Sequence, residues 1–194
     1  MADKLLIVVI TMPDHEAEDE ADRIRYMLKS GIVDRVHIRK PEWDSGRIEK
    51  LIRTIGNDLH HLLSVHSCPE LLKMYPALGY HFSALRSVPS RRPSVLSYSC
   101  HTPEEVYQKG NECDYVTLSP VFDSISKQGY KAAAFGADIE YTALQTTLTV
   151  ALGGVTPVHF GELRRRGYRG AAMLGYAWTT PLQKFLNQVK CYNS

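Results

Sequence analysis

The sequence lacks the cysteine patterns that mark zinc-binding, redox-active and disulfide-stabilised proteins. None of its four cysteines forms a C-x-x-C pair, which excludes the common zinc and redox motifs. They also lie farther apart than the cysteines of small disulfide-rich secreted folds. They are Cys68, Cys100, Cys113 and Cys191. We therefore expect free thiols in a reducing compartment, with the cytoplasm as the setting.

Strong charge and long apolar runs are absent as well. The formal net charge is only +2 at pH 7, which is too small to indicate nucleic-acid binding. The apolar run from Leu5 to Ile10 ends at Pro13 without a small-residue cleavage site, so a signal peptide is not expected. No stretch is long enough to span a membrane. We expect neither a nucleic-acid nor a membrane partner, and we interpret the first apolar run as a buried strand.

Short apolar or β-branched runs alternate with helical patterns along the chain. Near-continuous apolar runs are typical of parallel strands that are covered on both faces. Eight such runs span 4–10, 33–39, 61–65, 79–82, 94–99, 114–118, 148–152 and 170–174. Apolar residues at helical spacing fill most of the intervals. The clearest helical segments span 17–28, 48–59 and 178–189.

Helix boundaries are marked by capping residues. A Ser or Thr followed closely by Pro is typical of a helix start, and Gly is typical of the position after a helix. The expected starts are Ser67, Thr102, Thr156 and Thr180, and the expected ends lie at Gly31 and Gly167. Only the connection 83–93 is too short for more than one helical turn.

Alternating strands and helices predict the α/β class with a parallel sheet. Eight units predict a closed (β/α)8 TIM barrel, with residues 1–194 as a single domain. The alternative is a doubly wound open sheet, which usually has a glycine-rich first turn. The corresponding stretch, "ITMPDHE", has no glycine. We therefore favour the barrel.

The active site of such a barrel lies at the C-terminal ends of its strands. In this chain those ends carry basic and hydroxyl groups and few carboxylates, which favours an anionic ligand such as phosphate. Gly153 and Gly154 follow the seventh run and Gly175 follows the eighth, where barrels of this class bind phosphate. The alternative is that the two adjacent glycines only form a tight turn.

Three side chains at the strand ends are candidates for catalysis. Lys127, in the loop after the sixth run, can reach a phosphate or a leaving group if the loop acts as a lid; otherwise it is a solvated lysine. Arg39 ends the second run, where its guanidinium suits phosphate oxygens or a structural ion pair. His66 can act as a general base or a hydrogen-bond donor.

The other histidines near strand ends are interpreted as packing or structural residues. These are His37, His81 and His101. The sequence has no H-x-H pair and no carboxylate that obviously accompanies a histidine. It therefore assigns no metal ligand and gives no reason to expect zinc.

Five stretches in order resemble one known family. They are "VHIRKPEWDSG", "SYSCHTPEEV", "DYVTLSPVFDSISKQG", "ALGGVTP" and "GYRGAAMLG". The chain resembles the thiamine-phosphate synthase (thiamine-phosphate pyrophosphorylase) family, which also includes the thiazole tautomerases. The resemblance implies a barrel enzyme of thiamine biosynthesis. The synthase is a transferase that joins hydroxymethylpyrimidine diphosphate to thiazole phosphate, releases pyrophosphate and uses Mg²⁺.

The resemblance also implies roles for individual residues. Arg39 corresponds to the arginine that contacts the diphosphate, and Ser99 precedes a signature formed by His101, Glu104 and Glu105. A loop of hydroxyls and one lysine holds phosphate oxygens in the family. In this chain the corresponding residues are Ser124, Ser126 and Lys127, and the thiazole-phosphate site corresponds to Gly153, Gly154 and Gly175. The resemblance points to small phosphorylated substrates and to a homo-oligomer.

Three positions depart from the family pattern. In the family an Asp that binds Mg²⁺ ends the third strand, whereas this chain reads "SVHS", with His66 near the place of the acid. A second metal-binding Asp follows the fourth strand, whereas "YHFSALRS" has no acid. The family lysine two places after Arg39 is Pro41 here, and Lys40 is its candidate replacement.

These departures leave two further hypotheses beside the synthase. One is a metal-free isomerase similar to the thiazole tautomerases, although that branch is expected to have a histidine where Pro120 stands. In such an isomerase His66 would supply acid–base chemistry. The other hypothesis is a non-catalytic, regulatory protein that binds a phosphorylated metabolite.

Overall fold

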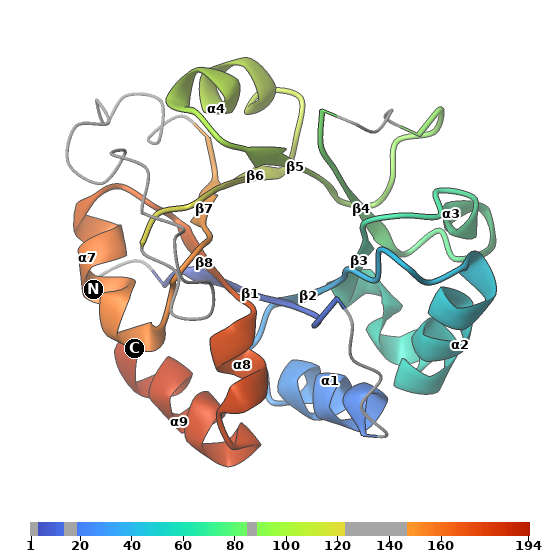
Figure 1. The fold of residues 1–194 in the computed structure, drawn as a ribbon, viewed down its shortest axis with the longest axis horizontal. Helices are drawn as coiled ribbons and strands as arrows, with labels where there is room; N and C mark the ends of the chain where they lie inside the picture. The colour runs from blue at the N-terminus through green and yellow to red at the C-terminus, as the bar shows by residue number, and fades with distance from the viewer. Residues whose placement is uncertain (1–3, 14–18, 85–88, 123–146) are drawn as a thin grey trace.

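The eight strands form a closed parallel barrel, which confirms the fold predicted from the sequence (Figure 1). A computed structural model describes residues 4–13, 19–84, 89–122 and 147–194. The strands are β1 (Leu6–Ile10), β2 (Arg35–Ile38), β3 (Leu63–Val65), β4 (Gly79–Phe82), β5 (Leu96–Cys100), β6 (Tyr115–Leu118), β7 (Thr149–Ala151) and β8 (Gly170–Met173). All eight predicted strands are present; β4 has the predicted bounds, and the others are shifted or shortened by a few residues.

The pairing of β1 with both of its neighbours excludes an open sheet. Val8 lies opposite Arg35 of β2 on one side and opposite Ala172 of β8 on the other. All eight strand pairs are parallel. The C-terminal ends of all strands therefore open at the same end of the barrel.

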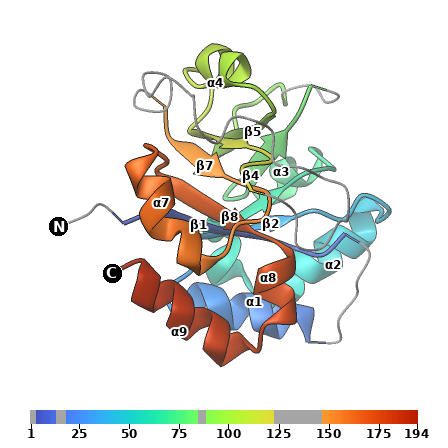
Figure 2. The same cartoon turned by 60° about the vertical axis from the view of Figure 1, so that its left-hand side comes forward.

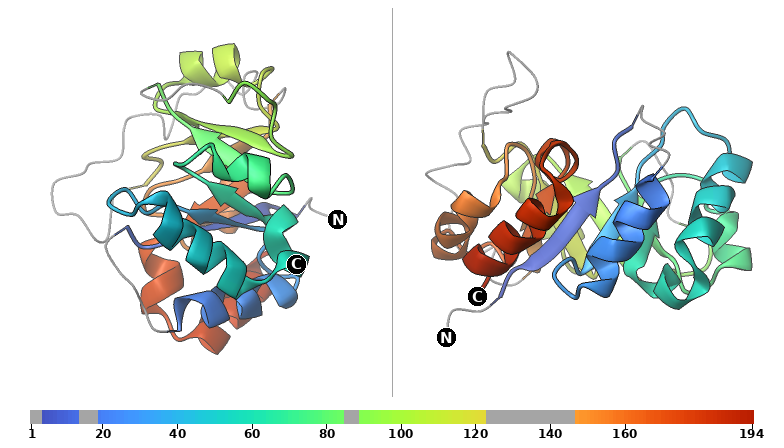
Figure 3. Two further views of the ribbon diagram at one scale, coloured as in Figure 1. Left: turned by 90° about the vertical axis from the view of Figure 1, so that its right-hand side faces the viewer. Right: turned by 90° about the horizontal axis from the view of Figure 1, so that it is seen from below.

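Helices cover the outside of the barrel (Figure 3). They are α1 (Glu20–Lys29), α2 (Ser45–Ile55), α3 (Leu71–Met74), α4 (Pro103–Lys109), α7 (Phe160–Arg165), α8 (Gly175–Thr179) and α9 (Leu182–Tyr192), with the 3-10 segments η1 (Asn57–Leu62) and η2 (Pro157–His159). Helices α1 and α8 lie side by side (Figure 2). Arg23 of α1 joins them by donating to the carbonyl oxygens of Ala177 and Thr180, at 2.7 Å each.

One predicted helix start is wrong, and one predicted helical segment is divided between two helices. Ser67 does not cap a helix, because Cys68 has a φ of 58° and turns the chain away before α3 begins at Leu71. The predicted helical segment 178–189 spans the end of α8 and most of α9, and α9 begins close to the start expected at Thr180. Pro181 forces Thr180 into an extended conformation, as residues before proline usually are. By contrast, Thr102 caps α4 as expected, accepting a hydrogen bond from the Glu105 backbone N–H at 3.2 Å.

The buried apolar side chains form two layers, because successive residues of a strand point to opposite faces. The larger layer lies between the strands and the helices and includes Val36, Ile52 and Phe160, all fully buried. A smaller group inside the barrel consists of Val8, Ile10, Tyr115, Val150 and Ala172. Four of these five residues come from β1, β7 and β8, so the apolar part of the interior lies on one side.

The other side of the interior is polar. The alternate positions of β2 to β6 carry histidines, hydroxyls and one arginine, which are buried or half-buried. They are Arg35, His37, Ser64, His66, His81, Ser97, Ser99, Tyr115 and Thr117. Beneath them the buried Arg35 donates to the carbonyl oxygens of Leu63 and His61. The barrel is therefore divided lengthwise into an apolar and a polar half.

Within the described residues, no helix has the length and apolar character needed to cross a lipid bilayer.

Candidate functional site

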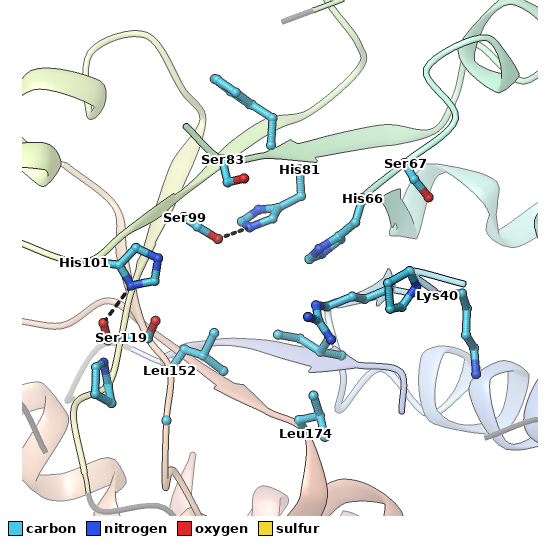
Figure 4. Close-up of a pocket in the computed structure, with 16 residues that line it drawn as sticks. Lys40, His66, Ser67, His81, Ser83, Ser99, His101, Ser119, Leu152 and Leu174 are labelled. Carbon is cyan, nitrogen blue, oxygen red and sulfur yellow. Dashed lines mark hydrogen bonds between the residues drawn. The ribbon is translucent and has the colours of Figure 1, made fainter. Parts of the chain in front are cut away.

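A cavity of about 570 Å³ opens at the C-terminal ends of the strands, where the fold predicts the active site (Figure 4). Most of the walls come from the ends of the strands and the loops that follow them. The polar lining residues are Arg39, Lys40, His66, Ser67, His81, Ser83, Ser99, His101 and Ser119. The apolar lining includes Ile10, Leu152 and Leu174. The cavity thus has a polar side and an apolar side, as the barrel interior below it does.

His37, His66 and His81 converge on the floor of this cavity, and we call them the histidine cluster. They project from β2, from the end of β3 and from β4. The His37 Nδ1 atom lies 2.9 Å from His66 Nε2. The His66 and His81 rings are 4.4 Å apart between centroids, and the His37 and His81 rings are 4.9 Å apart. His66 faces the cavity, whereas His37 is fully buried.

Hydroxyl groups bind one nitrogen of His37 and both nitrogens of His81. His37 Nε2 is hydrogen-bonded to the Tyr115 hydroxyl. His81 Nδ1 and Nε2 each lie 2.8 Å from a serine hydroxyl, those of Ser97 and Ser99. These contacts fix the orientation of both rings, so the nitrogens that face the cavity are preorganised.

Burial keeps the two inner imidazoles neutral. It lowers the pKa of His81 to about 3. Burial, reinforced by the neighbouring His81 and Arg35, lowers the pKa of His37 well below its ordinary value. A neutral imidazole can donate one hydrogen bond, accept another or bind a metal through its free nitrogen.

The cluster corrects the sequence interpretation of these histidines. His37 and His81 are buried and hydrogen-bonded, as expected of packing residues. The sequence assigns no metal ligand, however, and does not predict that these two residues converge with His66. Their ligand nitrogens, with that of His66, all lie within 4.8 Å of one another. A periodic signal was present. In "RVHIR", "SVHS", "YHFS" and "LSYS", polar residues occupy every second position, which indicates that one polar face runs through four consecutive strands.

The described residues do not fit a magnesium ion. Mg²⁺ prefers oxygen ligands, usually carboxylates and waters in an octahedral arrangement. No carboxylate lines the cavity in the described part of the chain, and the only candidate metal-binding group found there is the histidine cluster. The Mg²⁺ implied by the family resemblance therefore finds no carboxylate ligand at the ends of β3 and β4.

Arg39 lies at the rim of the cavity. Its backbone N–H donates to the Thr11 hydroxyl oxygen at 2.9 Å, and that hydroxyl donates to the Arg39 carbonyl oxygen at 3.2 Å. Thr11 is itself fully buried, so its hydroxyl fixes both the N–H and the carbonyl group of Arg39. The exposed Arg39 guanidinium has no ion-pair partner among the described residues. It is therefore available to an anion in the cavity.

Lys40 does not replace the missing family lysine. Its ammonium is buried and lies 2.8 Å from Glu20 Oε1 of α1. It also lies 4.7 Å from the centre of the Trp43 ring. Lys40 thus lines the cavity, but its ammonium neutralises the buried carboxylate of Glu20.

The glycine loop after β7 borders the same cavity. Gly153 has a φ of 93° and Gly154 a φ of 62°, a region that glycine occupies readily and other residues rarely. A Cβ atom on Gly153 would lie 2.8 Å from the Pro120 Cα atom, so the loop needs glycine there to pack against the loop after β6. Thr156 is then the N-cap of η2, which begins at Pro157. Gly175 is the first residue of α8.

Two further predicted residues take part in hydrogen bonds near the cavity. Ser99 lines it and contacts His81. His101 lines the opposite wall and its Nδ1 lies 3.2 Å from the Ser119 carbonyl oxygen. Glu105 accepts from the His101 backbone N–H at 2.6 Å and so stabilises the turn into α4. Ser124, Ser126 and Lys127 lie outside the described residues.

Comparisons with known proteins agree with the fold and identify the family. The family model described as thiamine monophosphate synthase matches residues 7–176. Among curated proteins, the chain is similar to the thiamine-phosphate synthase of Synechococcus sp. (strain CC9605). The identity is 24% over 179 residues, which cover 87% of this chain and 50% of that protein. The chain therefore spans about half the length of this curated relative.

Two solved structures resemble the barrel closely. One is a thiamine phosphate pyrophosphorylase from Bacteroides thetaiotaomicron, with a TM-score of 0.80, 24% identity and coverage of 97% of each chain. The other is a thiamine phosphate pyrophosphorylase from Pyrococcus furiosus. It has a TM-score of 0.74, 16% identity and coverage of 98% of this chain and 96% of that one. At these identities the structures support the fold.

Proposed function

Because the chain belongs to the thiamine monophosphate synthase family, we propose that it is a transferase of thiamine biosynthesis. In this proposal it couples hydroxymethylpyrimidine diphosphate to thiazole phosphate and releases pyrophosphate. Both substrates are small and phosphorylated, which suits an active site that offers cationic and hydroxyl groups and few acids.

One observation carries the proposal. Arg39, from the end of β2, and Gly153, from the end of β7, line the same cavity. An exposed guanidinium suits the oxygens of a diphosphate. A glycine loop that leads into a helical turn suits a second phosphate. A cavity with two anion-binding features at separate strands matches a reaction between two phosphorylated molecules.

In this proposal the residues act mainly by electrostatic stabilisation of the leaving group. When the bond between the pyrimidine methylene and the diphosphate breaks, negative charge gathers on the departing pyrophosphate. Arg39 stabilises that charge at the rim, and Lys127 is its predicted companion from the loop after β6. Gly153 and Gly154 hold the thiazole phosphate through their backbone, which orients the second substrate. His66 contributes a hydrogen bond from the cavity floor.

A direct assay tests the transferase. Purified protein is incubated with both substrates, with Mg²⁺ and with a chelator, and thiamine phosphate is measured by its conversion to a fluorescent thiochrome derivative. Product that depends on both substrates supports the proposal. Saturable binding of thiazole phosphate without product would instead support a regulatory binding protein.

The second candidate is a metal-free isomerase that acts on a thiazole carboxylate phosphate. The observation that favours it is the pair formed by His66 and His37 at 2.9 Å in a cavity that no described carboxylate lines. A histidine hydrogen-bonded to a second imidazole can hold or move a proton without a metal. Isomerase turnover that is unchanged by chelator and lost in His66→Ala would support this candidate over the transferase.

A further inference from the structure

We propose that the histidine cluster is a binding site for a divalent transition-metal ion, with zinc as the best match. His37, His66 and His81 would supply three nitrogen ligands on the floor of the cavity. Metal binding itself is independent of the reaction, whereas the use of the metal to bind a diphosphate rests on the proposed transferase function.

The distances within the cluster suit a small ion. Zinc–nitrogen bonds are about 2.0–2.1 Å long, so two ligand nitrogens of a tetrahedral site lie about 3.4 Å apart. The three ligand nitrogens already lie within 4.8 Å of one another, and one pair is 2.9 Å apart. Small rotations of the rings therefore bring all three within bonding distance of one ion.

The nitrogens that face away from this point are already bonded as metal-binding histidines require. A histidine ligand usually directs its second nitrogen to an oxygen that fixes the ring. Here the Tyr115 hydroxyl holds His37 Nε2, and the Ser97 hydroxyl holds His81 Nδ1 from deeper in the barrel. This leaves His37 Nδ1 and His81 Nε2 to face the ion, and Ser99, now 2.8 Å from His81 Nε2, would be displaced.

The ligand type decides which metal is expected. Three imidazoles without a carboxylate suit borderline ions such as Zn²⁺ and Co²⁺, and they suit the hard Mg²⁺ poorly. Three protein ligands also leave one position of a tetrahedral ion open. His66, His81 and Ser99 line the cavity, so the open position faces the space that the substrates would enter. A diphosphate oxygen is a suitable fourth ligand there.

The competing interpretation is a proton relay through the hydrogen-bonded His37 and His66, with His81 packed against them, that never binds a metal. Both interpretations explain why buried histidines lie together, but they differ in a quantity that can be measured without substrate. Metal affinity of the full-length chain separates them, and it does so whether or not the protein makes thiamine phosphate.

The experiment is a titration of chelator-treated protein with Co²⁺, followed by visible absorption. We expect one equivalent of Co²⁺ to bind per chain with the intense bands of a four-coordinate ion, and one equivalent of Zn²⁺ to displace it and abolish the bands. Inorganic pyrophosphate should shift the bands by entering the open position. Absence of saturable Co²⁺ and Zn²⁺ binding in the wild-type protein overturns the proposal and supports the relay.

Matched variants locate the site. His66→Ala removes a half-buried ligand. Because loss of a residue that only supports a ligand weakens metal binding by up to about 100-fold, loss of the ligand itself should weaken Co²⁺ binding by at least about 100-fold. His101→Ala removes a histidine from the same cavity outside the cluster and should leave binding unchanged. Tyr115→Phe should weaken binding by about 10- to 100-fold. Circular dichroism shows that each variant is folded. Equal binding by the wild type and the folded His66→Ala variant would overturn the assignment.

Discussion

The Lys40 ammonium lies 2.8 Å from Glu20 Oε1, and the exposed fractions of the two side chains are only 0% and 4%. The pair connects the loop after β2 to α1 and supports the wall beside Arg39. Removing one member of a buried ion pair deprives the other charge of compensation in an environment that solvates it poorly. Lys40→Met should therefore lower the free energy of unfolding by about 3–5 kcal/mol, measured by urea denaturation.

An exposed ion pair provides the control for that prediction. Lys29 and Asp58 lie 3.3 Å apart, but both side chains are more than half exposed. Exposed pairs stabilise proteins by less than about 1 kcal/mol, so Lys29→Ala should change the stability little. Similar losses in both variants would mean that burial of the Lys40 pair is not the cause.

Gly153 should not tolerate a side chain. Its φ of 93° is unfavourable for alanine, and the new Cβ atom would lie 2.8 Å from the Pro120 Cα atom. Gly153→Ala should lower stability by about 1–3 kcal/mol and weaken the binding of thiazole phosphate. Gly161→Ala is the matched control, because its Cβ atom would meet only the flexible end of Arg165 at 3.6 Å within α7. Thermal unfolding and calorimetry with thiazole phosphate measure the two effects.

The cysteines should differ sharply in reactivity. Burial, with Glu105 nearby, raises the pKa of the Cys100 thiol to about 12, and the thiolate is the reactive form. At pH 8 only about one Cys100 thiol in 10,000 is ionised. We expect an alkylating reagent to modify the exposed Cys191 first and to modify Cys100 only after denaturation, as read by peptide mass spectrometry. Early labelling of Cys100 in the native protein would contradict its burial beneath α4.

Arg39 is the residue through which the transferase proposal is most easily tested by mutation. If its guanidinium binds the diphosphate, Arg39→Ala should lower kcat/KM by about 100- to 1,000-fold, as loss of one donor to a developing charge does. Arg39→Lys should recover only part of this, because an ammonium cannot form two parallel hydrogen bonds. Steady-state kinetics at varied pyrimidine diphosphate provide the measurement, and equal stability of the three proteins is the control.

The order and type of the strands could be predicted from the sequence because each strand is a local feature. The run "KLLIVVI" is apolar enough to be a buried strand in any fold, and helical patterns separate most of the eight runs. The Thr180-Pro181 pair predicts the start of α9 to within two residues, because the restriction that Pro181 places on Thr180 is local. Ser67 was mistaken for a cap because nothing in the sequence shows that Cys68 adopts a positive φ.

The site was only partly predictable, because it depends on which residues of different strands share a level in the barrel. The rule that ligands bind at strand ends led directly to Arg39, Ser99 and Gly153, which line the cavity. The convergence of His37 with His66 and His81 depends on the stagger between β2, β3 and β4, which no single strand encodes. Lys40 looked like a ligand-binding residue because its partner, Glu20, lies 20 positions away in the chain.

The division of the barrel interior into an apolar and a polar half determines which substitutions can alter ligand binding without altering the fold. Along each strand, outward side chains that pack against the helices alternate with inward side chains that line the barrel. Neighbouring residues are therefore constrained differently, one by helix packing and the next by the barrel interior. Substitutions at the inward positions of β2 to β6 can replace one ligand chemistry with another, while the outward positions preserve the architecture. The protein is thus a suitable scaffold for engineering. A new binding specificity requires substitutions only at a few inward-facing positions of four or five short strands.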